Sequence, residues 1–181
     1  MMIQFIRYPN VKTLFIILLL ALSFSRTKIE KNGDILRLAI PSVSLGFTAL
    51  ETNLEGTKYL FKSLILCQLY TETLKRITHK RRPNGGCCKS FPSGHTSAAF
   101  NGAAFVHKRY GVIFSIPLYF GAIYTAYSRV YANKHYVEDV IAGASLGIFC
   151  GFYYNEKYNN ALKFIPYVNN KSFGFSIIKR F

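Results

Sequence analysis

The segment Phe91-Pro92-Ser93-Gly94-His95-Thr96-Ser97 predicts a tight turn that leads into a helix. Pro92 and Gly94 favour the turn, and Ser93 is of the residue type that caps helix N-termini. The N–H groups at the start of a helix attract an anion such as phosphate, and the Ser93 hydroxyl adds another donor. His95 would then lie beside that anion, where an imidazolium can protonate a departing oxygen.

Two further motifs flank this segment. Lys75 and Arg82-Pro83 precede it, and Ser128-Arg129, His135 and Asp139 follow it. Arginine offers a planar fork to two phosphate oxygens and lysine a compact charge, so these three cations suit a phosphate ligand. A polybasic patch at a membrane interface is the alternative interpretation of Lys75, because it opens a run of basic residues.

The spacing of His135 and Asp139 predicts that both lie on one face of a helix. A carboxylate that accepts a hydrogen bond from one imidazole nitrogen leaves the other nitrogen free to attack. Alone, such a pair is usually a hydrogen bond on a helix surface. After the two earlier motifs, it indicates a candidate nucleophile.

Together these motifs, over residues 75–151, resemble the type 2 phosphatidic acid phosphatase (PAP2) superfamily. The resemblance implies that His135 is the nucleophile and forms a phosphohistidine, that His95 is the general acid, and that Asp139 orients His135. It implies a reaction without metal or cofactor, and the sequence has no acidic cluster to suggest a metal site. The phosphate-binding residues that it implies are Lys75, Arg82, Ser93, Gly94 and Arg129.

The resemblance also implies an all-α fold, a six-helix transmembrane bundle of the PAP2 type. The 181 residues suit a single domain over positions 1–181, and half of them are hydrophobic. Six apolar stretches are expected to form the helices, at residues 14–22, 35–50, 59–74, 96–107, 112–127 and 137–154. Residues 1–25 also have the basic start and small residues of a cleavable signal peptide, which is the alternative to a first transmembrane helix.

The formal net charge of +15 implies an anionic partner. Cations lie between apolar stretches rather than along one continuous stripe, which favours a phosphorylated lipid and a membrane over nucleic acid. Residues 158–181 form a basic, aromatic tail, either a membrane-surface segment or a loosely ordered terminus. Gly143, Gly147 and Gly151 follow at four-residue spacing, which predicts close helix packing.

The four cysteines match no zinc motif. Cys87 and Cys88 are adjacent, in the loop expected at the active site. A disulfide between them requires an oxidising compartment, and the sequence leaves their redox state open.

The resemblance favours a bacterial inner-membrane lipid phosphatase with its active site toward the periplasm, although the balance of lysine and arginine does not fix the orientation. Lipid A is the first substrate candidate, and phosphatidylglycerophosphate and undecaprenyl diphosphate are the alternatives. A secreted soluble acid phosphatase, a lipid-linked phosphotransferase and a non-enzymatic lipid-binding module are the competing functions. The complete set of His95, His135 and Asp139 argues against the last of these. The sequence determines neither the head group nor the oligomeric state.

Overall fold

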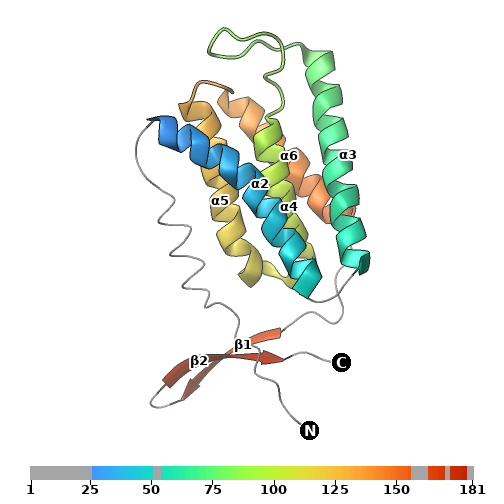
Figure 1. Ribbon diagram of the computed structural model, residues 1–181, viewed down its shortest axis with the longest axis vertical. Coiled ribbons are helices and arrows are strands. Elements are labelled where there is room, and N and C mark those ends of the chain that lie inside the picture. Colours follow the sequence, from blue (N-terminus) through green and yellow to red (C-terminus); the bar gives the residue numbers. More distant parts are fainter. Residues whose placement is uncertain (1–25, 51–53, 156–162, 170–171, 179–181) are drawn as a thin grey trace.

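A computed structural model describes residues 26–50, 54–155, 163–169 and 172–178 of the chain. Within these residues, five helices form a bundle, and a two-stranded hairpin follows them (Figure 1). The helices are α2 (Arg26–Leu50), α3 (Leu54–Thr78), α4 (Gly94–Tyr110), α5 (Val112–Tyr131) and α6 (Val137–Tyr153). The predicted helical fold is confirmed. The helix or signal peptide predicted within residues 1–25 lies outside the described residues.

Helices α2 to α5 extend beyond the predicted apolar stretches, and α6 ends one residue before its predicted end. The start of α2 is the largest difference, because the helix begins at Arg26, nine residues before the expected position 35. The added residues include Glu30 and Asp34, which bind cations at the candidate site. Pro41 and Pro117 lie inside α2 and α5, as their positions in the predicted stretches required.

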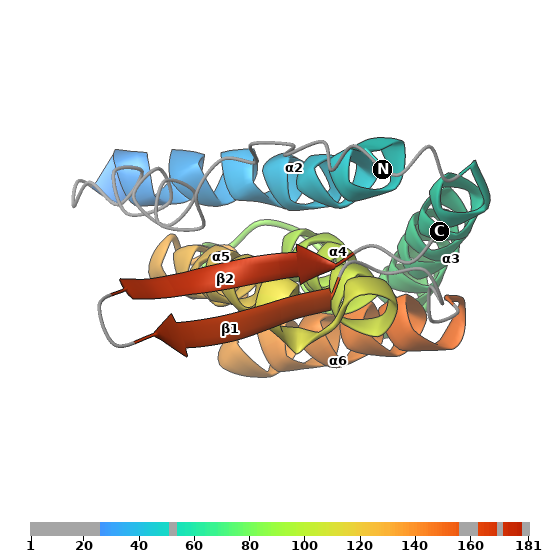
Figure 2. The same ribbon diagram turned by 90° about the horizontal axis from the view of Figure 1, so that it is seen from below.

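Helix α4 is the centre of the bundle and packs against all four other helices. Viewed from below, α2 and α6 lie on opposite sides of α4 and α5, and α3 lies at the side (Figure 2). Small residues on α4 let its neighbours approach closely, and Gly102 illustrates this: a Cβ atom there would lie 3.1 Å from the backbone nitrogen of Pro41. Phe105 and Val106 on the same helix are fully buried in the apolar core.

The predicted close packing of the glycines on α6 is confirmed. A Cβ atom added at Gly143 would lie 2.5 Å from the carbonyl oxygen of Ser93, and one at Gly151 would lie 2.6 Å from Cβ of Ala104. Gly147 faces the backbone of α4 in the same way, between Ser97 and Asn101. The glycine face therefore brings the backbone of α6 against α4, and it positions the start of α6 beside the start of α4.

The C-terminal tail contains secondary structure that was not predicted. Strand β1 (Lys163–Asn169) pairs antiparallel with β2 (Ser172–Ile178) and contacts none of the described helices. The alternation Ser172-Phe173-Gly174-Phe175-Ser176 is the sequence signal for a strand, whereas the tail was predicted to be a membrane-surface segment or a loosely ordered terminus.

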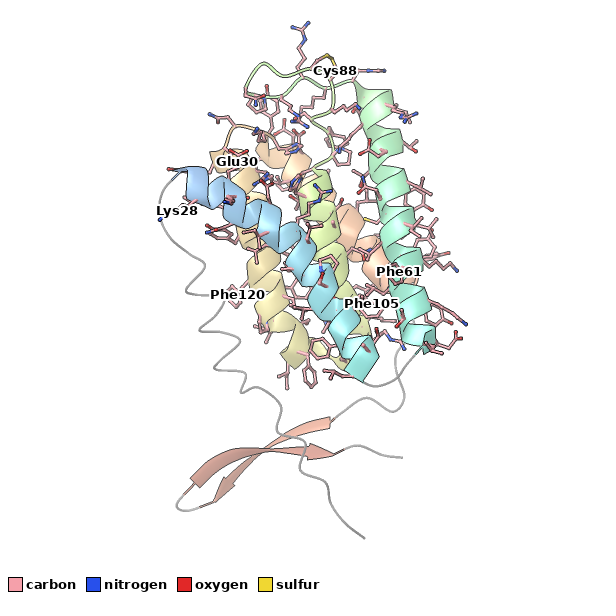
Figure 3. All side chains as sticks on the ribbon, in the orientation of Figure 1. Lys28, Glu30, Phe61, Cys88, Phe105 and Phe120 are labelled. Atoms are coloured by element: carbon pink, nitrogen blue, oxygen red, sulfur yellow. A yellow bond between two sulfur atoms is a disulfide. The ribbon has the colours of Figure 1, made fainter. Side chains whose placement is uncertain are left out.

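The outer faces of four helices carry large apolar side chains that no other described residue covers. On α3 and α5, Phe61 and Phe120 point away from the bundle, whereas Phe105 of α4 points into it (Figure 3). The exposed set continues on α2 with Ile35 and Leu38 and on α6 with Ile141 and Phe149. By length and composition, the segment Lys28–Leu50 is the one described helix apolar enough to cross a membrane, which alone is weak evidence.

Enlarging a glycine on the packed face of α6 tests the contact between α4 and α6. Gly147→Val is expected to lower the free energy of unfolding by about 1–3 kcal/mol, because the added carbons meet the backbone of α4. The measurement is thermal unfolding of the detergent-solubilised protein. Ser145→Val is the matched control, because Ser145 is exposed on the same helix. Equal stability of the two variants would contradict the close packing.

Candidate active site

The three predicted motifs meet at one end of the bundle. The α3–α4 loop (residues 79–93), the α5–α6 loop (residues 132–136) and the start of α2 all lie at this end (Figure 1). A cavity of about 380 Å³ opens between them. Six residues that were predicted for the site line this cavity: Lys75, Arg82, Gly94, His95, Arg129 and His135.

The geometry of His135 leaves one imidazole nitrogen available for attack. Its Nδ1 atom lies 2.7 Å from the carbonyl oxygen of Ser90, which can only accept a hydrogen bond. Nδ1 therefore carries the proton, and in the neutral ring the lone pair is on Nε2. The side chain is 5% exposed and lines the cavity. This tautomer is the one that a nitrogen nucleophile requires.

The electrostatic environment of His135 favours the neutral ring. Burial is the main cause that lowers the pKa of His135 to about 4, and the positive charges of Arg82 and Lys75 lower it further. The hydrogen bond to Ser90 and the charge of Asp139 oppose this shift. The net effect is a histidine that is unprotonated at neutral pH.

The predicted relation between Asp139 and His135 is corrected in two respects. His135 is not on the helix with Asp139, because α6 begins at Val137 and Tyr136 is its N-cap residue. Oδ2 of Asp139 lies 3.9 Å from Nδ1 of His135, which is beyond hydrogen-bonding distance. The carboxylate acts on the histidine through Ser90 instead, because the Ser90 hydroxyl donates to Oδ2 at 2.5 Å.

Asp139 is a fully buried carboxylate with three hydrogen-bond donors. Besides Ser90, the backbone N–H of Tyr136 donates to Oδ2 at 3.0 Å, and Nζ of Lys80 donates to Oδ1 at 2.7 Å. Lys80 also pairs with Glu138 at 2.7 Å. Burial tends to lower the pKa of Lys80, but the hydrogen bonds to Asp139 and Glu138 outweigh it and raise the pKa above its ordinary value. Lys80 and Ser90 are site-supporting residues that were missed in the sequence.

His95 lies in the first turn of α4 and faces the start of α2. Its Nε2 atom is 2.9 Å from Oδ1 of Asp34 and 3.3 Å from Nη1 of Arg37. A carboxylate oxygen can only accept a hydrogen bond, so Asp34 favours the form of His95 with a proton on Nε2. Asp34 and Arg37 were not predicted, although two charged residues one turn apart beside an apolar stretch are a recognisable signal.

Arg129 joins α5 to α2 through its two terminal nitrogen atoms, and its third nitrogen binds the adjacent Ser128 of α5. Nη1 donates to Oδ1 of Asp34 at 2.7 Å, Nη2 donates to the carbonyl oxygen of Glu30 at 2.5 Å, and Nε donates to the hydroxyl of Ser128 at 3.1 Å. Gly33 makes this approach possible, because a Cβ atom there would overlap the side chain of Ser128. The guanidinium, 4% exposed, is therefore fixed in position at the cavity wall.

The remaining predicted cations come from the end of α3 and the loop that follows. Nε of Arg82 is buried and has no hydrogen-bond partner among the described residues, which suits a donor that awaits a ligand oxygen. A Cβ atom at Gly94 would lie 3.1 Å from Nζ of Lys75, so the glycine leaves room for the ammonium group at the start of α4. Both cations thus border the helix N-terminus that was predicted to attract phosphate.

Ser93, Cys87 and Cys88 are not among the residues that line the cavity. Ser93 is at the N-cap position of α4, as predicted, but its side chain makes no capping hydrogen bond. Its hydroxyl is fully buried and accepts from Thr96 at 2.9 Å, and its backbone N–H donates to the carbonyl oxygen of Asp139. Cys87 and Cys88 form a disulfide in the α3–α4 loop (Figure 3).

A family model described as the PAP2 superfamily matches residues 56–162, more than half of the chain. The chain belongs to the PAP2 superfamily. The match spans α3 to α6 and both loops at the cavity, so it includes every predicted site residue. Within the described residues, no group of three or more His, Cys, Asp or Glu side chains is arranged to hold a metal ion.

Three lipid A phosphatases are similar in sequence to part of this chain. A lipid A 1-phosphatase of Porphyromonas gingivalis is 41% identical over 73 residues, which cover 39% of this chain and 16% of the relative. A lipid A 4'-phosphatase of Helicobacter pylori is 35% identical over 86 residues, 46% of this chain and 42% of the relative. A lipid A 1-phosphatase of Rhizobium etli is 32% identical and is matched over 44% of its length. The matched segments thus span less than half of each curated relative.

The crystal structure of LpxE from Aquifex aeolicus has the same fold. The two structures superpose with a TM-score of 0.63 at 24% sequence identity, over 79% of this chain and 93% of LpxE. The helical architecture of this chain is therefore that of a solved structure.

The protonation of His135 can be followed by NMR with labelled histidine rings. We expect the His135 ring to stay neutral, protonated on Nδ1, until the pH approaches about 4. In the unfolded chain the ring takes up its second proton near the ordinary pKa of 6.5. The folded state therefore loses stability relative to the unfolded chain as the pH falls from 6.5 to about 4. A His135 titration near pH 6.5 would contradict the buried, cation-flanked environment.

Removal of the Lys80 charge tests the support of the buried carboxylate. Lys80→Met is expected to destabilise the protein by about 1–3 kcal/mol, because Asp139 keeps its burial and loses its charged partner. Chemical denaturation in detergent measures the change. Lys89→Met is the control, since Lys89 is an exposed lysine of the same loop. If both variants unfold alike, the Lys80–Asp139 pair does not stabilise this loop.

Proposed function

We propose that this protein is a bacterial membrane phosphatase that removes a phosphate group from the head group of a lipid, lipid A first among the candidates. The observation that carries the proposal is the convergence of two histidines and three cations on one cavity. His135 and His95 line it together with Lys75, Arg82 and Arg129. Phosphoryl transfer depends mainly on positioning and charge neutralisation, and these groups supply both.

In the proposed reaction the phosphoryl group passes through His135. The lone pair of Nε2 forms a bond to phosphorus, and the bond from phosphorus to the lipid oxygen breaks. The negative charge of the bound phosphate favours the imidazolium form of His95, and this imidazolium, held by Asp34, gives its proton to that oxygen. Water then attacks the phosphohistidine and gives a proton to His95, the bond from phosphorus to Nε2 of His135 breaks, and inorganic phosphate leaves.

The other predicted residues have supporting roles in this proposal. Lys75, Arg82 and Arg129 would neutralise the phosphate oxygens, together with the backbone N–H groups at Gly94. Ser93 would act through its backbone, since its hydroxyl is buried beside Thr96. Asp139 would position His135 indirectly, because it holds the Ser90 residue whose carbonyl oxygen accepts from Nδ1.

The surface of the bundle supports a membrane location. Exposed apolar side chains on α2, α3, α5 and α6 would form an unusually large apolar surface for a secreted acid phosphatase. The Cys87–Cys88 disulfide lies at the cavity end, which supports an active site on the oxidising, periplasmic side of the inner membrane. The names of three relatives support lipid A over phosphatidylglycerophosphate and undecaprenyl diphosphate.

Phosphate release from lipids in the presence of EDTA tests the proposal. The purified protein is expected to release phosphate from lipid A faster than from phosphatidylglycerophosphate, phosphatidic acid or undecaprenyl diphosphate. His135→Ala should abolish release because the nucleophile is gone, and His95→Ala should slow it by about 10²–10⁴-fold.

His79→Ala is the matched control, because His79 is an exposed histidine of the α3–α4 loop outside the cavity lining. An acid-labile phosphoryl label on the protein, absent from His135→Ala, would mark the intermediate. Unchanged release by His135→Ala would refute histidine catalysis. Transfer to an added hydroxyl compound with no free phosphate would indicate a phosphotransferase instead.

A further inference from the structure

The cavity continues beyond the phosphate end, along the facing sides of α2 and α3. On α3 its wall includes Glu72 and Gln68, which precede Lys75 by three and seven residues. At 1.5 Å per residue, Gln68 lies about 10 Å deeper along the helix than Lys75. On α2 the wall includes Arg37, one turn deeper than Asp34. The two helices run in opposite directions and diverge toward the loop end (Figure 1).

This deeper wall has a different chemistry from the phosphate end. Nε2 of Gln68 donates to Oε1 of Glu72 at 3.2 Å, and Nζ of Lys75 donates to the same oxygen at 3.1 Å. In the described residues, these contacts leave Oε2 of Glu72 and the amide oxygen of Gln68 without a side-chain partner. A phosphate has no use for such acceptors, because a carboxylate repels it. Hydroxyl or amide N–H groups of a ligand would pair with them.

Gln68 is exposed, and it lies beside apolar side chains of the same helix. The same helix exposes Phe61, Ile65 and Leu69 on its outer face, so the segment lies within the apolar belt. Glu72 satisfies only part of the hydrogen-bonding capacity of the Gln68 amide, so this amide can pair with a ligand in the cavity that it lines.

We propose that Arg37, Gln68 and Glu72 form a head-group subsite that binds the hydroxyl and amide groups of a phosphorylated sugar. The subsite rests on the proposed function, since it places the sugar next to the phosphate cradle. It assigns substrate preference to the α2–α3 wall rather than to the cations. A lipid that carries phosphate without hydroxyl groups would use the phosphate end alone.

Gln68 is the residue to test, because Arg37 contacts His95 and Glu72 contacts Lys75, whereas Gln68 contacts neither histidine nor a phosphate-binding cation. Equilibrium lipid binding is measured on the detergent-solubilised full chain in a His135→Ala background, so that no turnover is needed. The probes are lipid A and phosphatidic acid. Adding Gln68→Leu is expected to weaken lipid A binding by about fivefold, the effect of one or two hydrogen bonds, and to change phosphatidic acid binding less than about twofold.

Thr73→Leu in the same background is the matched control, an exposed polar residue of α3 that does not line the cavity. It should leave the ratio of the two affinities unchanged. The subsite would be overturned if Gln68→Leu left the ratio of the two lipid affinities unchanged. It would also be overturned if the parent protein did not bind lipid A. Failure of the wild-type chain to release phosphate would count against the proposed function alone, because this binding ratio does not depend on catalysis.

Discussion

A carboxylate buried beneath the cavity holds the active-site end of this protein together. Asp139 is fully buried, and such a charge is tolerated only when donors surround it. Its donors come from the α3–α4 loop, through Lys80 and Ser90, and from the start of α6, through Tyr136. The requirement to satisfy one charge therefore fixes a loop of 15 residues, 79–93, against a helix start. His135 takes its tautomer from the same loop, because the Ser90 carbonyl oxygen accepts a hydrogen bond from Nδ1–H.

Helix α2 completes the site from the other side. Gly33 lets it approach Ser128 closely, and Arg129 then binds both Asp34 and the backbone of Glu30. Acidic groups thus lie next to cations in a cavity that we propose binds an anion. They hold the guanidinium and imidazole in place before a substrate arrives, and preorganised groups of this kind need no rearrangement when charge develops during a reaction.

The bundle separates an apolar exterior from a polar interior cavity. Helix α4 is packed by its four neighbours, whose outer faces remain apolar, so charged side chains gather where the helices end. Backbone contact between α4 and the glycine face of α6 makes this arrangement possible, since larger residues would separate the two helix starts that carry His95 and Asp139. Packing far from the cavity thereby determines the geometry of the site.

The resemblance to the PAP2 superfamily, together with the apolar stretches, predicted the helical fold, and the motifs predicted six residues that line the cavity. Apolar stretches and short motifs report these directly, because each depends on neighbouring residues. The strands of the tail were also encoded, in the alternation of residues 172–176, but that signal was missed. The first predicted helix, within residues 1–25, stays a prediction.

Only the tertiary structure decided which groups are partners. Asp34 of α2 lies 61 residues from His95, and Lys80 lies 59 residues from Asp139, so no local spacing could reveal either contact. The expected Asp139–His135 hydrogen bond was wrong for the same reason, since a loop residue, Ser90, comes between them. Sequence motifs state which chemical groups are present, whereas hydrogen-bond partners depend on the distances that packing of remote segments creates.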